Sequence, residues 1–600
     1  MSGRVTGWDG LRPASGWRVV GEFGLDLFGA RWTRQVWGTL RGWTVKGRLA
    51  GMARCGTAAL AGLCLALAFP PLRWAGLAWV GPALLLLAGE GAAPAQRWQL
   101  GYLAGWVWHG VALSWLWEIP VRGYPLLGWA ALVSYLALYP AVWLACVGTA
   151  FERARTWGGR TLAGLGAASV WVALEMLQAR LLGGFPWNLL GASQVEMIPL
   201  VQLASLTGVY GLSFLLVWFA AGLRAAAAAV WREPTRRYGW MRELAVPGLA
   251  VLLVFAWGWQ RVRAYTEGER RLRITVVQPS IPQTWIWDPQ ENGNRFRTLV
   301  ELTRQALQEP TDLLLWPEAA VPMFLRYDPV TQAAVTGLAR QHRIWMITGS
   351  DDAEPLGPAG ESEEADYFNA AFLIGPDGRL RSVYRKMHLV MFGEYIPWVE
   401  VLPFLRWFTP ITGQYTPGRN PVVFEIEAGA ADAASVSGSA PVRAAPLICF
   451  EDVFPHLARR FLEGGPDLWV NLTNDGWFGR SAAQWQHAAN AALRAVETGR
   501  PLVRCTNNGL SVWVDPLGRF RQILRDEWGS VYGAAWAVWE VPLPDRTALA
   551  GGTFYARHGD LWGWSCVIAA VAWQAARLRR RTGAVASADS VTDQAPRSGG

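Results

Sequence analysis

The sequence predicts an α-helical membrane domain of about eight spans joined to an extracytoplasmic α/β domain. Of the 600 residues, 52% are hydrophobic and 17% are charged, whereas soluble globular domains carry about 25% charged residues. The apolar residues form long runs over residues 52–260 and near 558–576, and residues 261–556 have a globular composition. This distribution is typical of a membrane protein with one large domain outside the bilayer.

Eight segments are long and apolar enough to cross a bilayer, which takes about 20 residues. We expect spans near residues 52–69, 74–90, 99–117, 125–150, 161–179, 198–222, 244–260 and 558–576. The break AFPPLRW between the first two can also be read as a re-entrant turn. The predicted divisions are an Arg-rich cytoplasmic extension (1–51), a membrane domain of about seven spans (52–260), a globular domain (261–556), a last span (557–577) and a cytoplasmic tail (578–600).

Lys and Arg in the short connections predict the orientation, because cytoplasmic loops carry an excess of both. Alternate connections carry FERARTWGGR and REPTRRYGWMRE, and the tail carries RLRRR, whereas EIPVRGYP and LLGGFPWNLLGASQVEMIP hold few. We therefore expect both termini in the cytoplasm and residues 261–556 on the other side. No cleavable signal peptide is expected, because about fifty polar, Arg-rich residues precede the first apolar run.

Cysteine spacing and charge argue against several other classes. The six cysteines form no CxxC pair and no His/Cys cluster, so we expect no structural zinc, no disulfide framework and no cofactor. The net charge of +9 comes from arginines in particular loops rather than from a basic face with interleaved aromatic residues. A nucleic-acid partner is therefore not expected.

In the globular part, strand-like runs alternate with helix-like stretches. LRITVVQ is typical of a strand, and NRFRTLVELTRQAL has the 3.6-residue spacing of an amphipathic helix. NAAFLIGPDGRLRSVYRK and SVWVDPLGRFRQI predict hairpins. The Ala/Ser/Gly stretch near 428–442 is expected to be a flexible insertion. Strands alternating with helices indicate a layered α/β domain.

Polar and reactive side chains follow four apolar runs of this domain. LLLWPE ends in Glu318, SVYRK in Lys386, PLIC in Cys449, and WVNLTND in Asn474 and Asp475. Groups just beyond the carboxyl ends of strands gather at one edge of an α/β sheet. We therefore expect these side chains to form one site.

Glu318, Lys386 and Cys449 supply the parts for covalent acyl transfer. A thiol with a pKa of about 8.5 is mostly protonated at neutral pH and needs a base or a nearby cation. A carboxylate can take the proton, and a lysine with a backbone N–H of the turn after Cys449 can stabilise an oxyanion. Taken singly, each is better read as a surface acid, a solvated hairpin residue or a core filler; together they favour catalysis. Cys505, which has no acidic neighbour, is expected to be structural.

At these residues the chain resembles the nitrilase superfamily and, within it, the apolipoprotein N-acyltransferase family. The resemblance covers about residues 52–576 and rests on VVQPSIPQTWIWDP, LLLWPEAAVP, YRKMHLVMFGEYIP, TPGRNPVVF, PLICFEDVFP and NLTNDGWFG. It implies an α-β-β-α sandwich in which Glu318 is the general base, Lys386 stabilises the oxyanion and Cys449 forms a thioester.

The resemblance also implies supporting residues around this triad. Glu394 in FGEY matches a second glutamate that supports the site, and Trp287 matches a tryptophan near the substrate entrance. Phe450 and Glu451 follow the nucleophile, where many members have Tyr-Glu. Other departures from the usual pattern are Met391 for Pro, Gly476 for Ala and Ile286 for Lys, and they bear on substrate preference rather than on the chemistry.

The implied activity is transfer of an acyl chain from a phospholipid to the α-amino group of the diacylglyceryl-cysteine at a lipoprotein N-terminus. The expected partners are that phospholipid, that apolipoprotein and the bacterial inner membrane, and nothing demands more than a monomer. A membrane-tethered amidase of the nitrilase type is the alternative enzyme, although a soluble substrate gains little from eight spans. A transporter or scaffold is the alternative from another class, with Glu175 in WVALEMLQ as its best intramembrane acid. A satisfied buried acid is the simpler interpretation of Glu175.

Overall fold

The chain folds into two compact units, Met1–Ala53 and Arg54–Gly600, and both β-sheets belong to the second unit. A computed structural model describes residues 45–121, 124–232, 238–356, 365–408, 414–427, 440–546 and 552–592. Most of the predicted N-terminal extension and most of the insertion near 428–442 lie outside these residues. The insertion is bounded by strands β6 (Phe424–Ile426) and β7 (Val442–Ile448), which pair with each other as expected for a connection between two strands.

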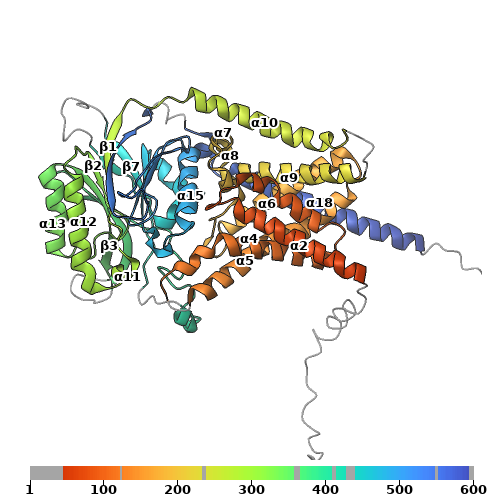
Figure 1. Cartoon of the computed structure of the whole chain (residues 1–600), viewed down its shortest axis with the longest axis horizontal. Coiled ribbons are helices and arrows are strands. Elements are labelled where there is room, and N and C mark those ends of the chain that lie inside the picture. Colours follow the sequence, from red (N-terminus) through yellow and green to blue (C-terminus); the bar gives the residue numbers. More distant parts are fainter. Residues whose placement is uncertain are drawn as a thin grey trace, which may run out of the picture. The chain divides into compact units, whose positions relative to one another are not determined.

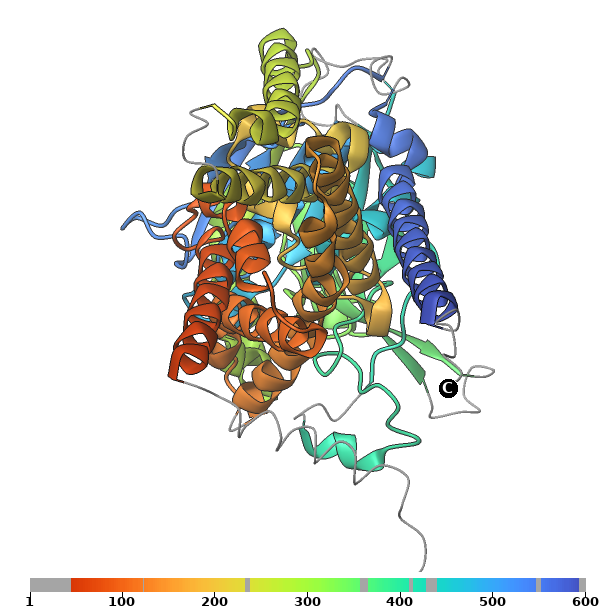
Figure 2. The same cartoon turned by 90° about the vertical axis from the view of Figure 1, so that its right-hand side faces the viewer.

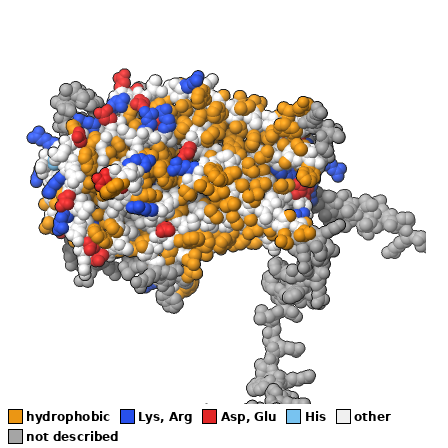
Figure 3. Space-filling model, viewed as in Figure 1, with side chains coloured by type: hydrophobic (Ala, Val, Ile, Leu, Met, Phe, Trp, Pro, Cys, Tyr) orange, Lys and Arg blue, Asp and Glu red, His pale blue; other side chains and the backbone are white. Residues whose placement is uncertain are grey.

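The N-terminal part is helical. Its helices are α2 (Val45–Leu67), α3 (Gly81–Ala88), α4 (Pro94–Ala112), α5 (Tyr124–Arg153), α6 (Trp157–Gln178), α7 (Ile198–Val201), α8 (Ala204–Thr207), α9 (Val209–Arg232) and α10 (Met241–Ala264). The C-terminal α18 (Leu561–Thr592) packs against α6 and α9, and α4 packs against α5 (Figure 2). Apolar side chains cover the outer face of these helices, whereas charged side chains gather over the sheet domain (Figure 3).

Five of the described helices are long and apolar enough to cross a membrane, namely α2, α5, α6, α9 and α10. Helices α4 and α18 lie where spans are predicted, without meeting that standard of length and composition. The predicted span at 74–90 is wrong as a single helix. That stretch forms a 3-10 turn, η1 (Ala75–Trp79), and then the eight residues of α3, too few to cross a bilayer. The alternative of a re-entrant turn agrees better with this geometry.

The predicted span at 198–222 is also broken. Helices α7 and α8 come first, and α9 begins only at Val209. Gly208 separates α8 from α9 with φ of +66°, and a Cβ there would lie 2.6 Å from the ring of Tyr555. A left-handed residue in close contact with a neighbouring ring ends a helix, because only glycine fits there without strain.

Two six-stranded sheets form the globular domain (Figure 1). The first has the order β12 (Ala535–Pro542), β1 (Arg271–Gln278), β2 (Leu313–Leu315), β3 (Trp345–Pro355), β4 (Ala365–Ile374) and β5 (Leu380–Arg385). The second has the order β11 (Phe520–Ile523), β10 (Val512–Val514), β9 (Leu502–Thr506), β8 (Leu468–Thr473), β7 and β6. The central pairs β1–β2–β3 and β7–β8–β9 are parallel. The predicted hairpins β4–β5 and β10–β11 are confirmed.

The sheets pack face to face between helices. Leu313 and Ile347 of the first sheet share one core with Leu447 and Val470 of the second. Helices α12 (Asn292–Ala306), which confirms the predicted amphipathic helix, and α13 (Pro329–His342) cover the outer face of the first sheet. Helix α15 (Ala483–Thr498) covers the second sheet. The layers are therefore helix, sheet, sheet, helix, as the resemblance implies.

Candidate active site

Glu318, Lys386 and Cys449 lie together at one end of the sandwich. Glu318 follows β2, Lys386 directly follows β5, and Cys449 directly follows β7. All three are buried, with exposed fractions of 7%, 1% and 9%. The structure therefore brings together the three residues that the strand-end pattern singled out.

Lys386 is the centre of a buried cluster of charges. Its Nζ lies 2.8 Å from Oε1 of Glu394 and 3.3 Å from Oε1 of Glu318. Asn369, on β4, donates from its Nδ2 to the same two oxygens, each at 2.8 Å. Oε2 of Glu394 accepts from the backbone N–H of Val390 at 2.8 Å. Burial opposes the charge of Lys386, but the carboxylates of Glu394 and Glu318 outweigh it, so the pKa of the ammonium is raised well above its usual value.

Cys449 sits on a strained turn. Its φ is +51°, a left-handed conformation that is uncommon for a residue with a side chain, and the 3-10 turn η7 (Cys449–Val453) follows at once. Its carbonyl accepts from Nδ2 of Asn471 at 3.1 Å and lies 3.3 Å from Nε2 of His487. Burial, then the charge of Glu318, raises the pKa of the thiol, and Lys386 acts in the opposite direction. The resting sulfur is therefore a thiol and needs a base to become a nucleophile.

Glu318 has an atom available for that proton. Its Oε1 is engaged by Asn369 and Lys386, whereas its Oε2 is buried and has no hydrogen-bond partner among the described residues. A buried carboxylate oxygen without a partner is costly, and such atoms are found where a substrate or a reacting group completes the site.

Glu451 ties the Cys449 turn to the Lys386 turn. Its Oε2 accepts from the N–H of Ile448 at 2.8 Å, and its Oε1 accepts from the hydroxyl of Tyr384 at 2.7 Å. The same Oε1 accepts from the N–H groups of Met387 (2.8 Å) and His388 (3.1 Å). Glu451 is fully buried, and its four hydrogen bonds hold the two loops in register.

The aromatic residues expected at the site face two directions. The Phe450 ring stacks on Trp187 at 5.8 Å between centroids and lies 5.9 Å from Phe185, both from the connection after α6. Trp287 is 41% exposed and meets Trp477 edge to face at 5.2 Å. Phe450 therefore packs toward the membrane helices, whereas Trp287 lies exposed beside the half-buried Trp477.

Asn474 and Asp475 lie behind the site rather than at its opening. Asp475 is fully buried and lies 2.7 Å from Nη2 of Arg504 and 2.8 Å from Nδ1 of His487. Burial opposes its charge, but Arg504 and His487 outweigh it and hold the pKa of Asp475 below its usual value. Arg504 also pairs with Asp452 at 2.8 Å. Asn474, 3% exposed, bonds to neighbouring amide side chains and to its own turn. Both residues are therefore held in place by neighbouring side chains of the domain.

Comparisons with known proteins match most of the chain to one family. The apolipoprotein N-acyltransferase N-terminal domain matches residues 61–222, and the carbon-nitrogen hydrolase domain matches residues 273–534. The apolipoprotein N-acyltransferase of Geobacter metallireducens is 35% identical over 88% of this chain and 95% of its own length. The chain belongs to the apolipoprotein N-acyltransferase family. Further members with this name, from Methylococcus capsulatus and Azotobacter vinelandii, are each 32% identical over 83% and 81% of this chain and 91% and 88% of their own.

Two solved structures also align with the sheet domain. A Nesterenkonia AN1 amidase from the nitrilase superfamily is 19% identical over 48% of this chain and 95% of its own, with a TM-score of 0.33. A carbon-nitrogen hydrolase from Helicobacter pylori is 16% identical over 48% and 94%, also with a TM-score of 0.33.

The sequence analysis did not single out several residues that hold the site together. Asn369 holds both carboxylates of the Lys386 cluster, and its signal is one amide inside the apolar run FNAAFLIG. Asn471 and Arg504 are polar residues in the middle of buried strands β8 and β9, which is the same signal. His487 lies on a helix, where nothing in its neighbours marks it.

Cys505 and Glu175, which the sequence analysis also singled out, lie outside this cluster. Cys505 is fully buried between the sheets and donates weakly to the carbonyls of Val277 and Leu315, as expected for a structural thiol. In the membrane part, Oε1 of Glu175 accepts from Trp171 at 2.9 Å and from the N–H of Leu190 at 2.8 Å. Its Oε2 is buried and has no hydrogen-bond partner among the described residues, so the prediction of a satisfied buried acid holds for one of the two oxygens only.

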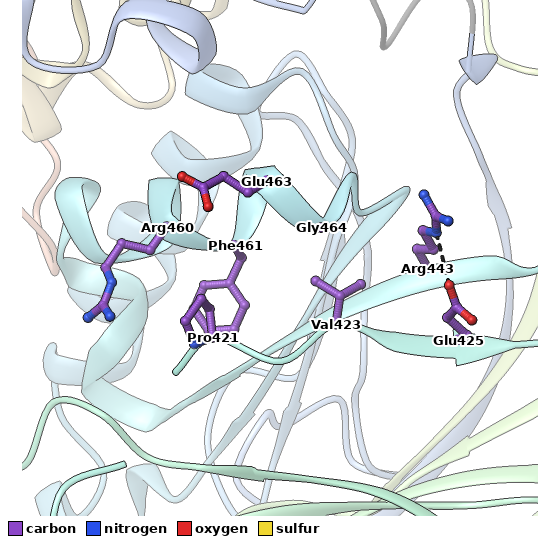
Figure 4. A pocket seen from close by; sticks show the side chains of 8 residues that line it. All are labelled: Pro421, Val423, Glu425, Arg443, Arg460, Phe461, Glu463 and Gly464. Carbon is purple, nitrogen blue, oxygen red and sulfur yellow. Dashed lines mark hydrogen bonds and ion pairs between the residues drawn. The ribbon is translucent and has the colours of Figure 1, made fainter. Parts of the chain in front are cut away.

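A pocket of the sheet domain lies away from the triad. A pocket of about 490 Å³ lies beside the edge strand β6, where Glu425 pairs with Arg443 at 3.3 Å (Figure 4). None of the triad lines it. Within the described part of the chain, no group of three or more His, Cys, Asp or Glu side chains is placed to hold a metal ion.

Proposed function

We propose that the chain transfers an acyl chain from a phospholipid to the α-amino group of an apolipoprotein's N-terminal diacylglyceryl-cysteine, through a thioester on Cys449. The observation that carries this proposal is the buried cluster of Glu318, Lys386 and Cys449 in a chain with membrane-spanning helices. Oε2 of Glu318 is free to take a proton, and Lys386 is held as a cation by two carboxylates. Membership of the family supports the choice of lipid and lipoprotein as substrates.

In the first half-reaction, Glu318 takes the proton of the Cys449 thiol while the sulfur attacks the ester carbonyl of the phospholipid. The ammonium of Lys386, with a backbone N–H of the turn after Cys449, stabilises the oxyanion. When the C–O bond breaks, Glu318 returns the proton to the departing lyso-phospholipid oxygen. The acyl chain is then held as a thioester, and Glu318 is again a carboxylate.

In the second half-reaction, the neutral amine of the apolipoprotein attacks the thioester carbonyl. Glu318 takes a proton from the attacking nitrogen, Lys386 again stabilises the oxyanion, and the C–S bond breaks. Glu318 then protonates the departing Cys449 sulfur. Covalent catalysis thus allows two lipid-anchored substrates to use one site in turn.

Labelled phospholipid and a peptide acceptor test this function. Purified protein should release lyso-phospholipid and gain the mass of one acyl chain at Cys449 before any acceptor is added. Addition of the acceptor should then move the label to its amine. Release of fatty acid to water alone would instead identify a membrane-tethered amidase, and no turnover would favour a transporter or scaffold.

We also propose that the sheet domain is extracytoplasmic, that both termini are cytoplasmic and that the protein acts as a monomer in the inner membrane. Ion pairs between helix ends support this orientation: Arg97 near the start of α4 pairs with Glu152 near the end of α5 (2.6 Å), and Arg160 near the start of α6 pairs with Glu243 near the start of α10 (2.6 Å). Helix α10 begins at this second pair and leads at its other end into β1. The Arg-rich end is therefore remote from the sheets, in agreement with an excess of positive charge on the cytoplasmic side.

Accessibility labelling tests the orientation. A cysteine introduced at Gln305, which is exposed on α12, should react with an impermeant maleimide in intact spheroplasts. Protection until the cells are lysed would reverse the topology.

A further inference from the structure

Helix α15 lies between the second sheet and the membrane helices (Figure 1). Every residue of it except Trp485 is buried. Ala488 and Ala491 belong to the hydrophobic core of the sheet domain, whereas Leu493 and Val496 belong to the core of the membrane part. A single helix therefore contacts both halves of the protein.

Gln486 of α15 binds three separate segments of the membrane part. Its Oε1 accepts from the indole N–H groups of Trp115 (3.1 Å) and Trp187 (2.8 Å). Its Nε2 donates to the carbonyl of Pro70, just after α2, at 2.9 Å and to that of Ala112, the last residue of α4, at 3.0 Å. A primary amide has two donors and two lone pairs, so all of its bonding capacity is used. At 1% exposure, such a complete set of partners holds the glutamine in one position.

His487 is the next residue along α15, and it contacts the turn that begins at Cys449, with its Nε2 2.9 Å from Oδ1 of Asp452. Its Nε2 lies 3.3 Å from the carbonyl oxygen of Cys449, and its Nδ1 lies 2.8 Å from Asp475. Trp187, which Gln486 binds, also stacks on Phe450 at 5.8 Å and lies 5.0 Å from the His487 ring. The membrane segments are therefore connected to the Cys449 turn in two ways. Gln486 is adjacent to His487 on α15, and Trp187 packs on both Phe450 and His487.

We propose that Gln486 is a positioning residue through which the membrane segments hold Cys449 in its reactive geometry. The inference rests on the proposed role of Cys449 as nucleophile. The left-handed turn at Cys449 is strained and persists only if its surroundings fix it. Part of that support comes from α15, whose own position is fixed by the membrane part at Gln486. The catalytic competence of the sheet domain thus depends on the membrane helices and not only on their delivery of lipid.

Gln486→Leu in the full-length protein tests the inference, with Gln202→Leu as the matched control. Gln202 is a fully buried glutamine of the membrane part; its Nε2 donates to the carbonyl of Leu517 of the sheet domain at 2.9 Å, and its Oε1 has no hydrogen-bond partner among the described residues. Both variants remove a buried amide tie between the two parts, but only the first lies beside His487. Both should lower the unfolding temperature.

In Gln486→Leu we expect kcat for lyso-phospholipid release to fall about 10–100-fold, because a displacement of about 1 Å at a reacting group can cost that much. KM for the phospholipid should stay within about twofold of wild type. The pH midpoint for alkylation of Cys449 by iodoacetamide should move toward the ordinary thiol value near 8.5. Gln486→Glu keeps the oxygen that accepts from both indole N–H groups, so its kcat and pH midpoint should lie between those of wild type and of Gln486→Leu. Gln202→Leu should keep the wild-type kcat and pH midpoint per folded molecule.

Equal kcat and equal alkylation profiles in the two leucine variants would overturn the inference. So would a loss confined to KM, which would place the effect in lipid binding. Alkylation does not need a lipid. If wild type forms no thioester yet the midpoint still moves only in Gln486→Leu, the positioning role stands and the proposed function fails.

Discussion

Replacing Lys386 by Met removes one buried charge and keeps most of the side-chain volume. Lys386 is 1% exposed between Oε1 of Glu394 at 2.8 Å and Oε1 of Glu318 at 3.3 Å. Without the ammonium, two carboxylates face each other across the single Nδ2 of Asn369. Removing one partner of a buried ion pair costs about 3–5 kcal/mol. For a domain of this size, about 2–4 °C per kcal/mol gives an unfolding temperature lower by roughly 6–20 °C at pH 7.5.

The loss should depend on pH with a definite sign. Two carboxylates without their cation share a proton, so in the variant their pKa values rise above those of the unfolded chain. A raised pKa in the folded state stabilises at low pH and is unfavourable as pH rises. The difference in unfolding temperature between variant and wild type should therefore shrink at pH 5 and grow toward pH 8. Thioester formation should fall at least about 10²–10³-fold, the effect of one lost oxyanion donor.

Intact-protein mass spectrometry and thermal unfolding at several pH values measure both effects. Arg385→Met is the control, because Arg385 directly precedes Lys386 but pairs with Asp352 at 2.9 Å, outside the triad. That variant should lose stability yet still form the thioester. A Lys386→Met protein that acylates within tenfold of wild type, or whose loss of stability is the same at pH 5 and pH 8, would refute this account of Lys386.

Three further predictions concern the triad and its surroundings. Glu318→Gln keeps the side-chain shape but cannot take a proton, so thioester formation should fall about 10²–10⁴-fold; normal acylation by mass spectrometry would exclude Glu318 as the base. Cys449→Ser should show no mass gain with phospholipid, whereas Cys505→Ser should acylate normally. The reverse pattern would show that Cys505 and not Cys449 is the nucleophile. Burial and the nearby Glu394 and Glu318 raise the pKa of Asp351 to about 6, against its hydrogen bond from Tyr415. Because a raised pKa makes the charged form unfavourable above it, Asp351→Asn should stabilise the protein at pH 7.5 by about 1–2 kcal/mol, with a gain that disappears toward pH 4 in calorimetric scans; a constant gain would contradict the sign.

Local patterns account for most of the fold that could be predicted. Strand and helix periodicity identified α12, both hairpins and the layered α/β class, because these depend on neighbouring residues. The span at 74–90 was wrong as a single helix, and of the span at 198–222 only the part from Val209 on belongs to a helix able to cross a membrane, α9. Apolar composition is the same for a spanning helix and for short helices folded into a packed core, and only contacts such as Gly208 against Tyr555 distinguish the two.

The sequence alone shows that Glu318, Lys386 and Cys449 each end an apolar run. Because residues at the carboxyl ends of strands meet at one edge of an α/β sheet, this pattern predicts that the three side chains form one site. Only the tertiary structure decided how they are held. Asn369 bonds to Glu318 across 51 residues of chain, and Gln486 bonds to Trp115 across 371. Such contacts depend on packing between distant segments and leave no local periodicity. Residue types at strand ends thus predict the chemistry of this site. Its rigidity comes from buried hydrogen bonds between segments far apart in the chain, which no single segment determines.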